Sequence, residues 1–266
     1  MGAFNVHGFE SIVGVIRAAA TAKSPAIIQV SEGAIKYMGL KPFVAMVTEV
    51  SRAIAPKIPL ALNIDHGKTF DSVAACIKAG FSSVHIDGSS LPLKENIKLT
   101  KKVINFAHKK GVWVQGEVGA IMGGHGDLGG VLAEIPIANI EETIKYVKET
   151  GVDTIAAAVG TAHGVYDNED IKVPMVKEIK DGTKIPFVLH GGSGLPEDKI
   201  KKAVKAGVNI INIGSDIKIA FSQTLVKNCA TTPKETDPRK LLSSTIDAVE
   251  AVVIRHMKIF GSAGKV

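Results

Sequence analysis

Residues 78–89 read Lys-Ala-Gly-Phe-Ser-Ser-Val-His-Ile-Asp-Gly-Ser, and this stretch decides the fold. A lysine followed closely by glycine is typical of a helix C-terminus, where the glycine takes the left-handed conformation. A short apolar run and then an acidic residue follow at once, as in a strand and its end. A similar order recurs at residues 109–111, 149–151 and 205–207, each directly before an apolar run. The recurrence indicates the repeated helix-to-strand loops of a β/α fold.

Eight short apolar runs are spread over the 266 residues. They are Gly2–Asn5, Ala26–Ser31, Leu60–Asp65, Ser83–Asp87, Val112–Glu117, Thr154–Gly160, Pro186–His190 and Ile210–Gly214. Runs that are apolar almost throughout are typical of parallel strands buried on both faces. Eight strand–helix units in this length predict an α/β fold, a (β/α)8 TIM barrel. A doubly wound open sheet is the alternative, but it would want a glycine-rich turn after Asn5, where the chain reads Val-His-Gly-Phe.

Helix-period segments fill the gaps between the runs. They include Ser72–Ala79, Lys94–Lys109, Ile140–Lys148, Lys172–Lys180 and Glu197–Ala206. Residues 227–266 hold no further strand, are interrupted by Pro233 and Pro238, and predict a C-terminal helical tail whose last helix is Leu241–Phe260. We expect one domain, a barrel over residues 1–266 that includes this tail.

Composition places the chain among ordinary globular proteins, with 45% hydrophobic and 22% charged residues. The formal net charge is +6, but lysine and arginine are spread along helix-like stretches rather than gathered in one basic block. This pattern favours a solvated surface over nucleic-acid binding, and it suits an anionic small substrate.

Signals for export or membrane insertion are missing from the sequence. The chain opens directly on an apolar run, and the charge-poor run between Asp153 and Asp167 is too short to span a bilayer. The two cysteines, Cys76 and Cys229, lie at no metal-ligand spacing. We therefore expect a cytoplasmic protein with neither nucleic-acid nor membrane partners.

Function in a barrel sits where the strands end on their C-terminal side, and polar residues stand at all eight predicted ends. Three of these ends carry a histidine: His66, His163 and His190. Three neutral imidazoles at one rim make a catalytic zinc site that keeps one position open. Any one of them alone would more simply be a hydrogen-bonded rim histidine. The remaining histidines are expected to be structural or on the surface, with His125 as the exception: His7, His85, His108, His125 and His256.

Two glycine-rich ends predict a phosphate site. Residues 190–194 read His-Gly-Gly-Ser-Gly and residues 214–216 read Gly-Ser-Asp, after the seventh and eighth strands. Barrels commonly bind phosphate there through backbone N–H groups and a helix N-terminus. Two ordinary glycine turns are the alternative.

Three carboxylates stand at neighbouring strand ends. Asp65 precedes a predicted zinc ligand, so it either moves a proton on the substrate or orients that ligand. Asp87 and Glu117 have the same two interpretations, and for them we favour support of the metal ligands or binding of a second cation.

Several motifs taken together resemble the class II, zinc-dependent fructose-bisphosphate and tagatose-bisphosphate aldolases. The likeness covers nearly the whole chain in order. It rests on Gln29-Val-Ser-Glu-Gly33, Asn63-Ile-Asp-His-Gly67, Ala79–Ser89, Gly116-Glu-Val-Gly119, Gly160-Thr-Ala-His-Gly164, Val188-Leu-His-Gly-Gly-Ser-Gly194 and Asp237-Pro-Arg239.

The resemblance implies reversible cleavage of a ketose 1,6-bisphosphate, first of all fructose 1,6-bisphosphate, to dihydroxyacetone phosphate and glyceraldehyde 3-phosphate. It implies that His66, His163 and His190 bind zinc, that Asp87 and Glu117 lie near the metal, and that Asp65 handles the proton of the C4 hydroxyl. The implied substrate-binding positions are Asn5, Ser31, Gly164, Gly191, Gly192, Ser193, Asn212, Ile213, Gly214, Ser215 and Arg239. A monovalent cation, Na⁺ or K⁺, and assembly into dimers or tetramers also follow from the resemblance.

Three departures from the family pattern matter. Gly126 stands where the loop after the fifth strand usually carries a glutamate that exchanges a carbon-bound proton. Asp167 replaces a lysine that many relatives carry four residues after the second zinc histidine. The first strand opens the chain, without the helix that usually covers the bottom of the barrel. Two hypotheses answer the first departure: His125 or Asp127 acts as the loop acid–base, or the substrate is another phosphorylated ketose.

Other functions fit the sequence less well. A Schiff-base aldolase would need a lysine at a central strand end, and Lys68 is the nearest. A zinc hydrolase would commonly carry a His-x-His pair on the first strand, which this chain does not have. A non-catalytic relative that binds sugar phosphates remains an alternative, and so does tagatose 1,6-bisphosphate as the substrate.

Overall fold

A computed structural model describes residues 1–121, 123 and 129–266. The eight strands are β1 (Gly2–Asn5), β2 (Ala26–Ser31), β3 (Leu60–Gly67), β4 (Ser83–Ile86), β5 (Trp113–Val118), β6 (Thr154–Ala157), β7 (Phe187–Leu189) and β8 (Val208–Ile213). All pair in parallel in sequence order, and β1 also pairs with β8, so the sheet closes into a barrel. The predicted single-domain (β/α)8 barrel is confirmed.

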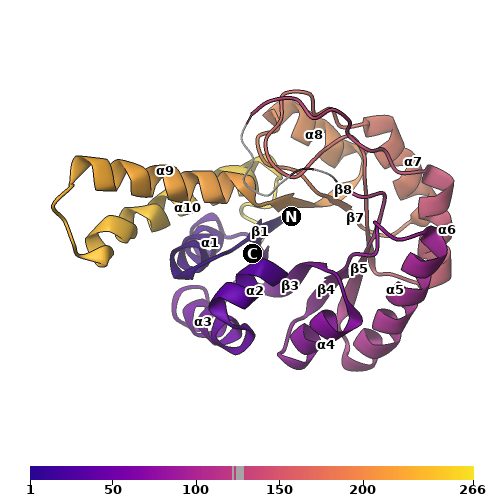
Figure 1. Ribbon diagram of the computed structural model, residues 1–266, viewed down its shortest axis with the longest axis horizontal. Coiled ribbons are helices and arrows are strands. Elements are labelled where there is room, and N and C mark those ends of the chain that lie inside the picture. Colours follow the sequence, from indigo (N-terminus) through magenta and orange to yellow (C-terminus); the bar gives the residue numbers. More distant parts are fainter. Residues whose placement is uncertain (122, 124–128) are drawn as a thin grey trace.

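Helices surround the barrel (Figure 1). They are α1 (Phe9–Ala22), α2 (Glu32–Met38), α3 (Leu40–Ile54), α4 (Phe70–Lys78), α5 (Leu93–Ala107), α6 (Ile140–Thr150), α7 (Val173–Thr183), α8 (Glu197–Ala206), α9 (Ser215–Thr231) and α10 (Pro238–Ile259), with a short 3-10 turn at His108–Lys110. The glycines predicted to end helices do adopt positive φ: 100° at Gly80, 66° at Gly111, 72° at Gly151 and 116° at Gly207. None of the helices in the described ranges is long and apolar enough to cross a membrane.

Most predicted element limits differ from the observed ones by one to three residues, and two of the larger differences have a local cause. β6 ends at Ala157 instead of Gly160, because Val159 pairs with Ile137 in an isolated antiparallel bridge. The last helix begins at Pro238 instead of Leu241, because the Asp237 side chain accepts a hydrogen bond from the backbone N–H of Arg239 and caps the helix there. Residue 227, the predicted start of the tail, lies inside α9.

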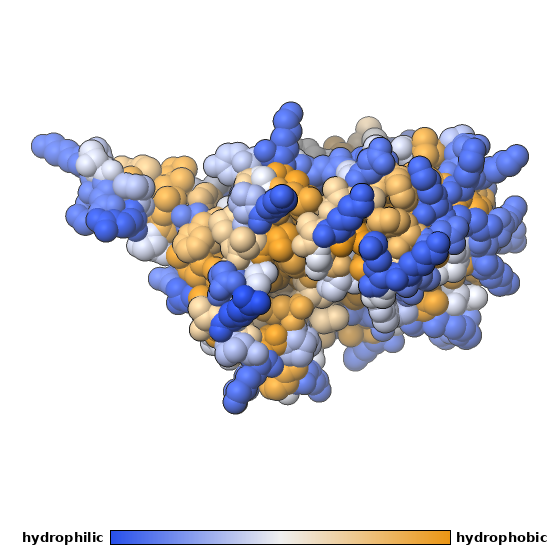
Figure 2. Space-filling model, turned by 90° about the horizontal axis from the view of Figure 1, so that it is seen from below, coloured by the Kyte–Doolittle hydropathy of each residue, from blue (hydrophilic) through white to orange (hydrophobic). Residues whose placement is uncertain are grey.

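The last two long helices form an arm. α9 and α10 lie side by side and reach out from the barrel, with the turn between them at the far end (Figure 1). The half of α10 nearer the barrel packs on α1 and buries Val249, Val253 and Met257. Figure 2 shows a hydrophilic tip and more hydrophobic flanks on this arm, and Val226 on α9 is 67% exposed. The arm therefore offers apolar surface beyond the barrel's own core.

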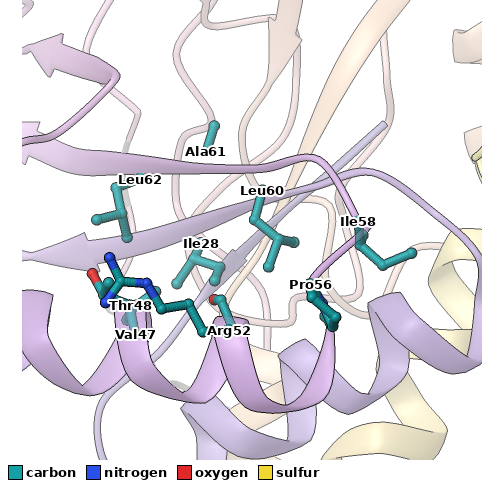
Figure 3. A pocket seen from close by; sticks show the side chains of 11 residues that line it. Ile28, Val47, Thr48, Arg52, Pro56, Ile58, Leu60, Ala61 and Leu62 are labelled. Atoms are coloured by element: carbon teal, nitrogen blue, oxygen red, sulfur yellow. The ribbon is translucent and has the colours of Figure 1, made fainter.

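A pocket lies on the outer wall of the barrel. Between α3 and the outer faces of β2 and β3 lies a pocket of about 370 Å³ lined by Ile28, Val47, Leu60 and Leu62 (Figure 3). It lies on the outside of the barrel and includes none of the predicted site residues.

The barrel interior is polar on the face that alternation turns inward. Asn5, Gln29, Asn63 and Ser83 are register partners on four adjacent strands. Their side chains form one hydrogen-bonded row: Ser83 Oγ donates to Asn63 (2.9 Å), Asn63 to Gln29 (2.8 Å) and Gln29 to Asn5 (3.3 Å). This row lies below the C-terminal strand ends and ends at Asp65.

Candidate active site

Three imidazoles converge where β3, β6 and β7 end. His66 Nε2 lies 3.2 Å from His163 Nε2 and 3.0 Å from His190 Nδ1. Two nitrogens bound tetrahedrally to one zinc at the usual bond length would lie about 3.3 Å apart. Each of these two distances suits a pair of ligands on one metal ion, whereas the ligand atoms that all lie within 4.8 Å of one another belong to Asp65, His66, His85 and His190, without His163.

The backbone at the end of β3 is bent to aim His66. Its φ is 52°, a left-handed conformation that few non-glycine residues adopt, and the register between β3 and β4 shifts between Ile64 and Gly67. The bend leaves no room at Gly67, where a Cβ would lie 2.6 Å from Val73 and 2.9 Å from the carbonyl oxygen of His85. Backbone strain of this kind persists where a site needs it.

Asp87 fixes the tautomer of His66. Its Oδ2 lies 2.6 Å from His66 Nδ1, so Nδ1 carries the proton and Nε2 faces the other two histidines. Ser89 donates to Asp87 Oδ1 through both its hydroxyl (2.6 Å) and its N–H (3.0 Å), and the Lys68 ammonium donates to Oδ2. The Asp87 carboxylate therefore accepts four hydrogen bonds: one from His66, one from Lys68 and two from Ser89.

Burial and neighbouring charge set the protonation of the histidines. Burial lowers the pKa of His190 well below its usual range, with the charge of His66 acting in the same direction, so His190 is neutral as a metal ligand must be. For His66, burial is outweighed by Asp65 and Glu117, which raise its pKa to about 9.

His85 joins the cluster, although the sequence pattern predicts only a structural or surface residue. It is fully buried, and its Nδ1 accepts a hydrogen bond from the backbone N–H of His66 (3.1 Å) while its Nε2 lies 3.4 Å from Glu117 Oε2. The geometry groups His85 with His66 and His190 as possible metal ligands. Since the Nδ1 lone pair is already used, His85 is better placed to hold the backbone of His66 than to bind metal through Nδ1.

Asp65 is buried beside the three imidazoles. Asn5 Nδ2 donates to its Oδ2 (2.7 Å), while its Oδ1 has no hydrogen-bond partner among the described residues. Burial alone would raise its pKa, but the charges of His66, His190 and His85 hold that pKa well below its usual range. A buried, ionised oxygen without a partner is suited to accept a proton from a ligand.

The glycine-rich ends line a small cavity above the barrel. It is lined by Asn5, Asp65, His163, Gly164, His190, Gly191, Ser193, Asn212, Gly214 and Ser215, nearly all of them predicted site residues. The backbone N–H groups of Gly214 and Asp216, at the start of α9, both donate to Ser193 Oγ (3.3 Å each). A Cβ at Gly191 would lie 2.1 Å from the carbonyl oxygen of Ala162, so only glycine fits there.

Comparison with known proteins decides the family. The profile of the family described as "Fructose-bisphosphate aldolase class-II" matches residues 1–265. The chain belongs to the class-II fructose-bisphosphate aldolase family. Like the family, it is a metal-dependent aldolase, and the clustered histidines and carboxylates are where its metal can bind.

Curated relatives carry two different names within this family. A fructose-bisphosphate aldolase of Geobacillus stearothermophilus is 39% identical over 100% of this chain and 92% of its own length. A 6-phospho-5-dehydro-2-deoxy-D-gluconate aldolase of Bacillus subtilis (strain 168) is also 39% identical, over 100% of this chain and 91% of its own length. Among solved structures, the YdjI aldolase of Escherichia coli K12 has a TM-score of 0.83 at 27% identity, covering 100% of this chain and 92% of that one.

Four of the predicted substrate-binding residues do not line this cavity. Ile213 is buried in the core, so only its backbone can face a ligand. Gly192 is buried as well, and its N–H donates to Asn212 O (3.1 Å). Ser31 caps α2 beside a neighbouring cavity, and the side chain of Arg239 is 89% exposed at the tip of the arm, paired with Asp237.

The remaining predicted site residues are Glu117, at the end of β5, and His125 and Asp127, in the loop that follows β5. Glu117 is fully buried, and neither of its carboxylate oxygens has a hydrogen-bond partner within the described ranges. His125 and Asp127, the predicted loop acid–base candidates, lie outside the described residues.

Replacing a converging histidine should remove the metal. We expect His163→Ala and His190→Ala each to weaken zinc binding at least about 100-fold, because each removes one of three ligands, and Asp87→Asn to weaken it about 10–100-fold by freeing the His66 ring. Zinc affinity is measured by competition with a chromophoric chelator. His108→Ala is the control, because that imidazole is half-exposed and pairs with Asp153. Unchanged zinc affinity in both alanine variants would contradict the assignment.

Proposed function

We propose that the protein is a zinc-dependent aldolase that cleaves a ketose 1,6-bisphosphate, with fructose 1,6-bisphosphate as the first choice. The products would be dihydroxyacetone phosphate and glyceraldehyde 3-phosphate. One observation carries the proposal: ring nitrogens of His163 and His190 lie within 3.2 Å of His66 Nε2, beside the buried carboxylate of Asp65. A metal site adjoining a general base is what aldol cleavage without a Schiff base needs.

Asp65 moves the proton of the cleavage step. In this mechanism its Oδ1 accepts the proton of the C4 hydroxyl as the C3–C4 bond breaks and C4 becomes the aldehyde carbon. Asn5 holds Oδ2 at 2.7 Å and so keeps Oδ1 directed at the substrate. The electron pair of the broken bond passes to the dihydroxyacetone phosphate half, and the reverse order of steps gives condensation.

The charge that develops on that half is what the metal stabilises. When bound, a zinc ion would supply Lewis-acid stabilisation of the negative charge in the transition state. His66, His163 and His190 would hold it, Asp87 would keep His66 in the right tautomer, and the low pKa of His190 keeps its ring neutral. Identification of the metal as zinc rests on the nitrogen donors and their spacing.

The phosphate of dihydroxyacetone phosphate would lie in the glycine-rich cradle. Backbone N–H groups at Gly214 and Asp216 stand at the start of α9, a helix of 17 residues whose N-terminus favours an anion. They now donate to Ser193 Oγ, and a phosphate oxygen would take the place of that acceptor. A Na⁺ or K⁺ ion near this cradle stays a prediction from the resemblance.

A second substrate deserves equal testing. The relatives named 6-phospho-5-dehydro-2-deoxy-D-gluconate aldolase are 37–39% identical to this chain, as similar as the fructose-bisphosphate aldolases. The same bond cleavage in that ketose would give dihydroxyacetone phosphate and 3-oxopropanoate. Gly126 in place of the family's loop glutamate supports a phosphorylated ketose other than fructose 1,6-bisphosphate but does not select among such ketoses. Tagatose 1,6-bisphosphate is the third.

We also propose that the protein assembles into a dimer or tetramer and resides in the cytoplasm. The arm of α9 and α10 extends apolar surface away from the barrel (Figures 1 and 2). Arg239 stands at its tip, too far from its own barrel to contact substrate there. If Arg239 binds substrate as the resemblance implies, it does so in the site of a neighbouring copy.

Cleavage should depend on bound metal. We expect release of triose phosphate from fructose 1,6-bisphosphate, abolished by EDTA and restored by zinc, with a smaller kcat/KM for tagatose 1,6-bisphosphate. A coupled assay on both substrates and on 6-phospho-5-dehydro-2-deoxy-D-gluconate measures this. Activity that survives EDTA but is lost on borohydride treatment with substrate would indicate Schiff-base chemistry and overturn the proposal.

The loop acid–base is tested by isotope exchange. We expect His125→Ala or Asp127→Asn to slow deuterium exchange at C3 of dihydroxyacetone phosphate at least about 100-fold, as loss of a general acid–base does. The exchange is followed by NMR, with zinc content measured in parallel as the control. Unchanged exchange in both variants would mean that neither residue replaces the missing glutamate.

Assembly is tested by complementation between variants. We expect Asp65→Asn and Arg239→Ala each to be weakly active and a mixture of the two to regain activity, because mixed assemblies pair an intact barrel with an intact arm. Light scattering gives the oligomeric state in the same samples. A monomeric protein, or a mixture no more active than its parts, would refute the shared site.

A further inference from the structure

A second cavity adjoins the proposed active site. It has a volume of about 300 Å³ and is lined by Asn5, Val6, His7, Ser31, Gly33, Ala34, Tyr37 and Lys218. Asn5 also lines the cavity that holds Asp65 and the glycine-rich cradle. The two cavities therefore meet at Asn5, whose amide contacts the Asp65 carboxylate.

A lysine ammonium lines the second cavity. Lys218, in the first turns of α9, is the one lining residue with a full charge among those the structure describes. His7 adds none, because burial and the charge of Lys218 lower its pKa to about 4. Ser31, His7 and Tyr37 add neutral polar groups, so the lining suits a small anion.

The order of groups along the substrate places its far end here. The dihydroxyacetone phosphate half occupies the cradle and Asp65 contacts the C4 hydroxyl, so the carbons beyond C4 extend past Asn5. Lys218 lies near enough to Asp65 for that charge to oppose the lowering of its pKa by burial. Lys218 therefore lines the second cavity within reach of the charge of Asp65.

We propose that Lys218 determines specificity by binding the anionic end of the aldehyde half of the substrate. The chemistry is a phosphate or a carboxylate: the phosphate of glyceraldehyde 3-phosphate or the carboxylate of 3-oxopropanoate. Lys218 acts in binding and takes no part in the proton transfer. This inference rests on the proposed aldolase function, and it names the residue that would recognise the aldehyde.

Condensation with three aldehydes tests the inference. Dihydroxyacetone phosphate is kept constant, and the partner is glyceraldehyde 3-phosphate, 3-oxopropanoate or uncharged glyceraldehyde. We expect Lys218→Met to lower kcat/KM for the preferred charged aldehyde by about 30-fold or more beyond its effect on glyceraldehyde, as loss of one member of a buried charge pair does. Lys218→Arg should recover most of that loss. The preferred aldehyde identifies the anion as phosphate or carboxylate.

Lys98→Met is the matched control, because it removes one positive charge from an exposed position on α5, a helix that does not line the cavity. It should leave all three reactions unchanged, and zinc content should be the same in every variant. An equal fall for all three aldehydes in Lys218→Met would overturn the inference, since a merely structural lysine would act in that way. If the wild-type enzyme condenses none of them, the proposed function itself fails.

Discussion

Three buried carboxylates, Asp65, Asp87 and Glu117, set the constraint on which the site depends. Ionised carboxylates are costly to bury unless hydrogen bonds or positive charge compensate them. Here Asn5 holds Asp65, while Lys68, Ser89 and His66 hold Asp87. Burial raises the pKa of Glu117 instead, with the imidazoles opposing it. The cluster therefore favours a cation at its centre, and three imidazole nitrogens are directed there.

Polar side chains that face the inside of the barrel compensate part of the cost of burying this cluster. The row of Asn5, Gln29, Asn63 and Ser83 has a direction, because an ionised Asp65 only accepts hydrogen bonds. Asn5 must donate its amide N–H to Asp65, so the amide oxygen of Asn5 faces Gln29 and accepts from it. In the same way Gln29 accepts from Asn63, and Asn63 accepts from the Ser83 hydroxyl. One charge at the rim thus orients amides on three strands. The cost of the strained φ of His66 is met in the same way, by the Asp87 and His85 contacts that hold it.

Strand ends could be predicted from sequence because the β/α units repeat one local order: a glycine that ends a helix, an apolar run, and a polar residue after it. His66, His163 and His190 followed from those ends, and the structure brings their nitrogens together. His85 did not, although two-residue alternation places it on the same face of β4 as Asp87, which is the signal that could have found it. Lys218 was missed for another reason: it stands one turn into a helix, and only the curve of the chain after β8 brings it beside Asn5. Such contacts depend on tertiary structure and leave no local pattern.

Two cavities that share one amide suggest how a single scaffold serves relatives with different substrates. In the proposed mechanism the cradle, the histidines and Asp65 would act on the dihydroxyacetone phosphate half and the C4 hydroxyl, which fructose 1,6-bisphosphate presents and 6-phospho-5-dehydro-2-deoxy-D-gluconate matches with its C3 hydroxyl. Only the group beyond the cleaved bond differs, and in the proposed binding mode that group would meet Ser31, His7 and Lys218. Changing residues there alters the aldehyde that binds without disturbing the metal or the base. Chemistry and selectivity are thus held by different elements, with Asn5 at the boundary between them.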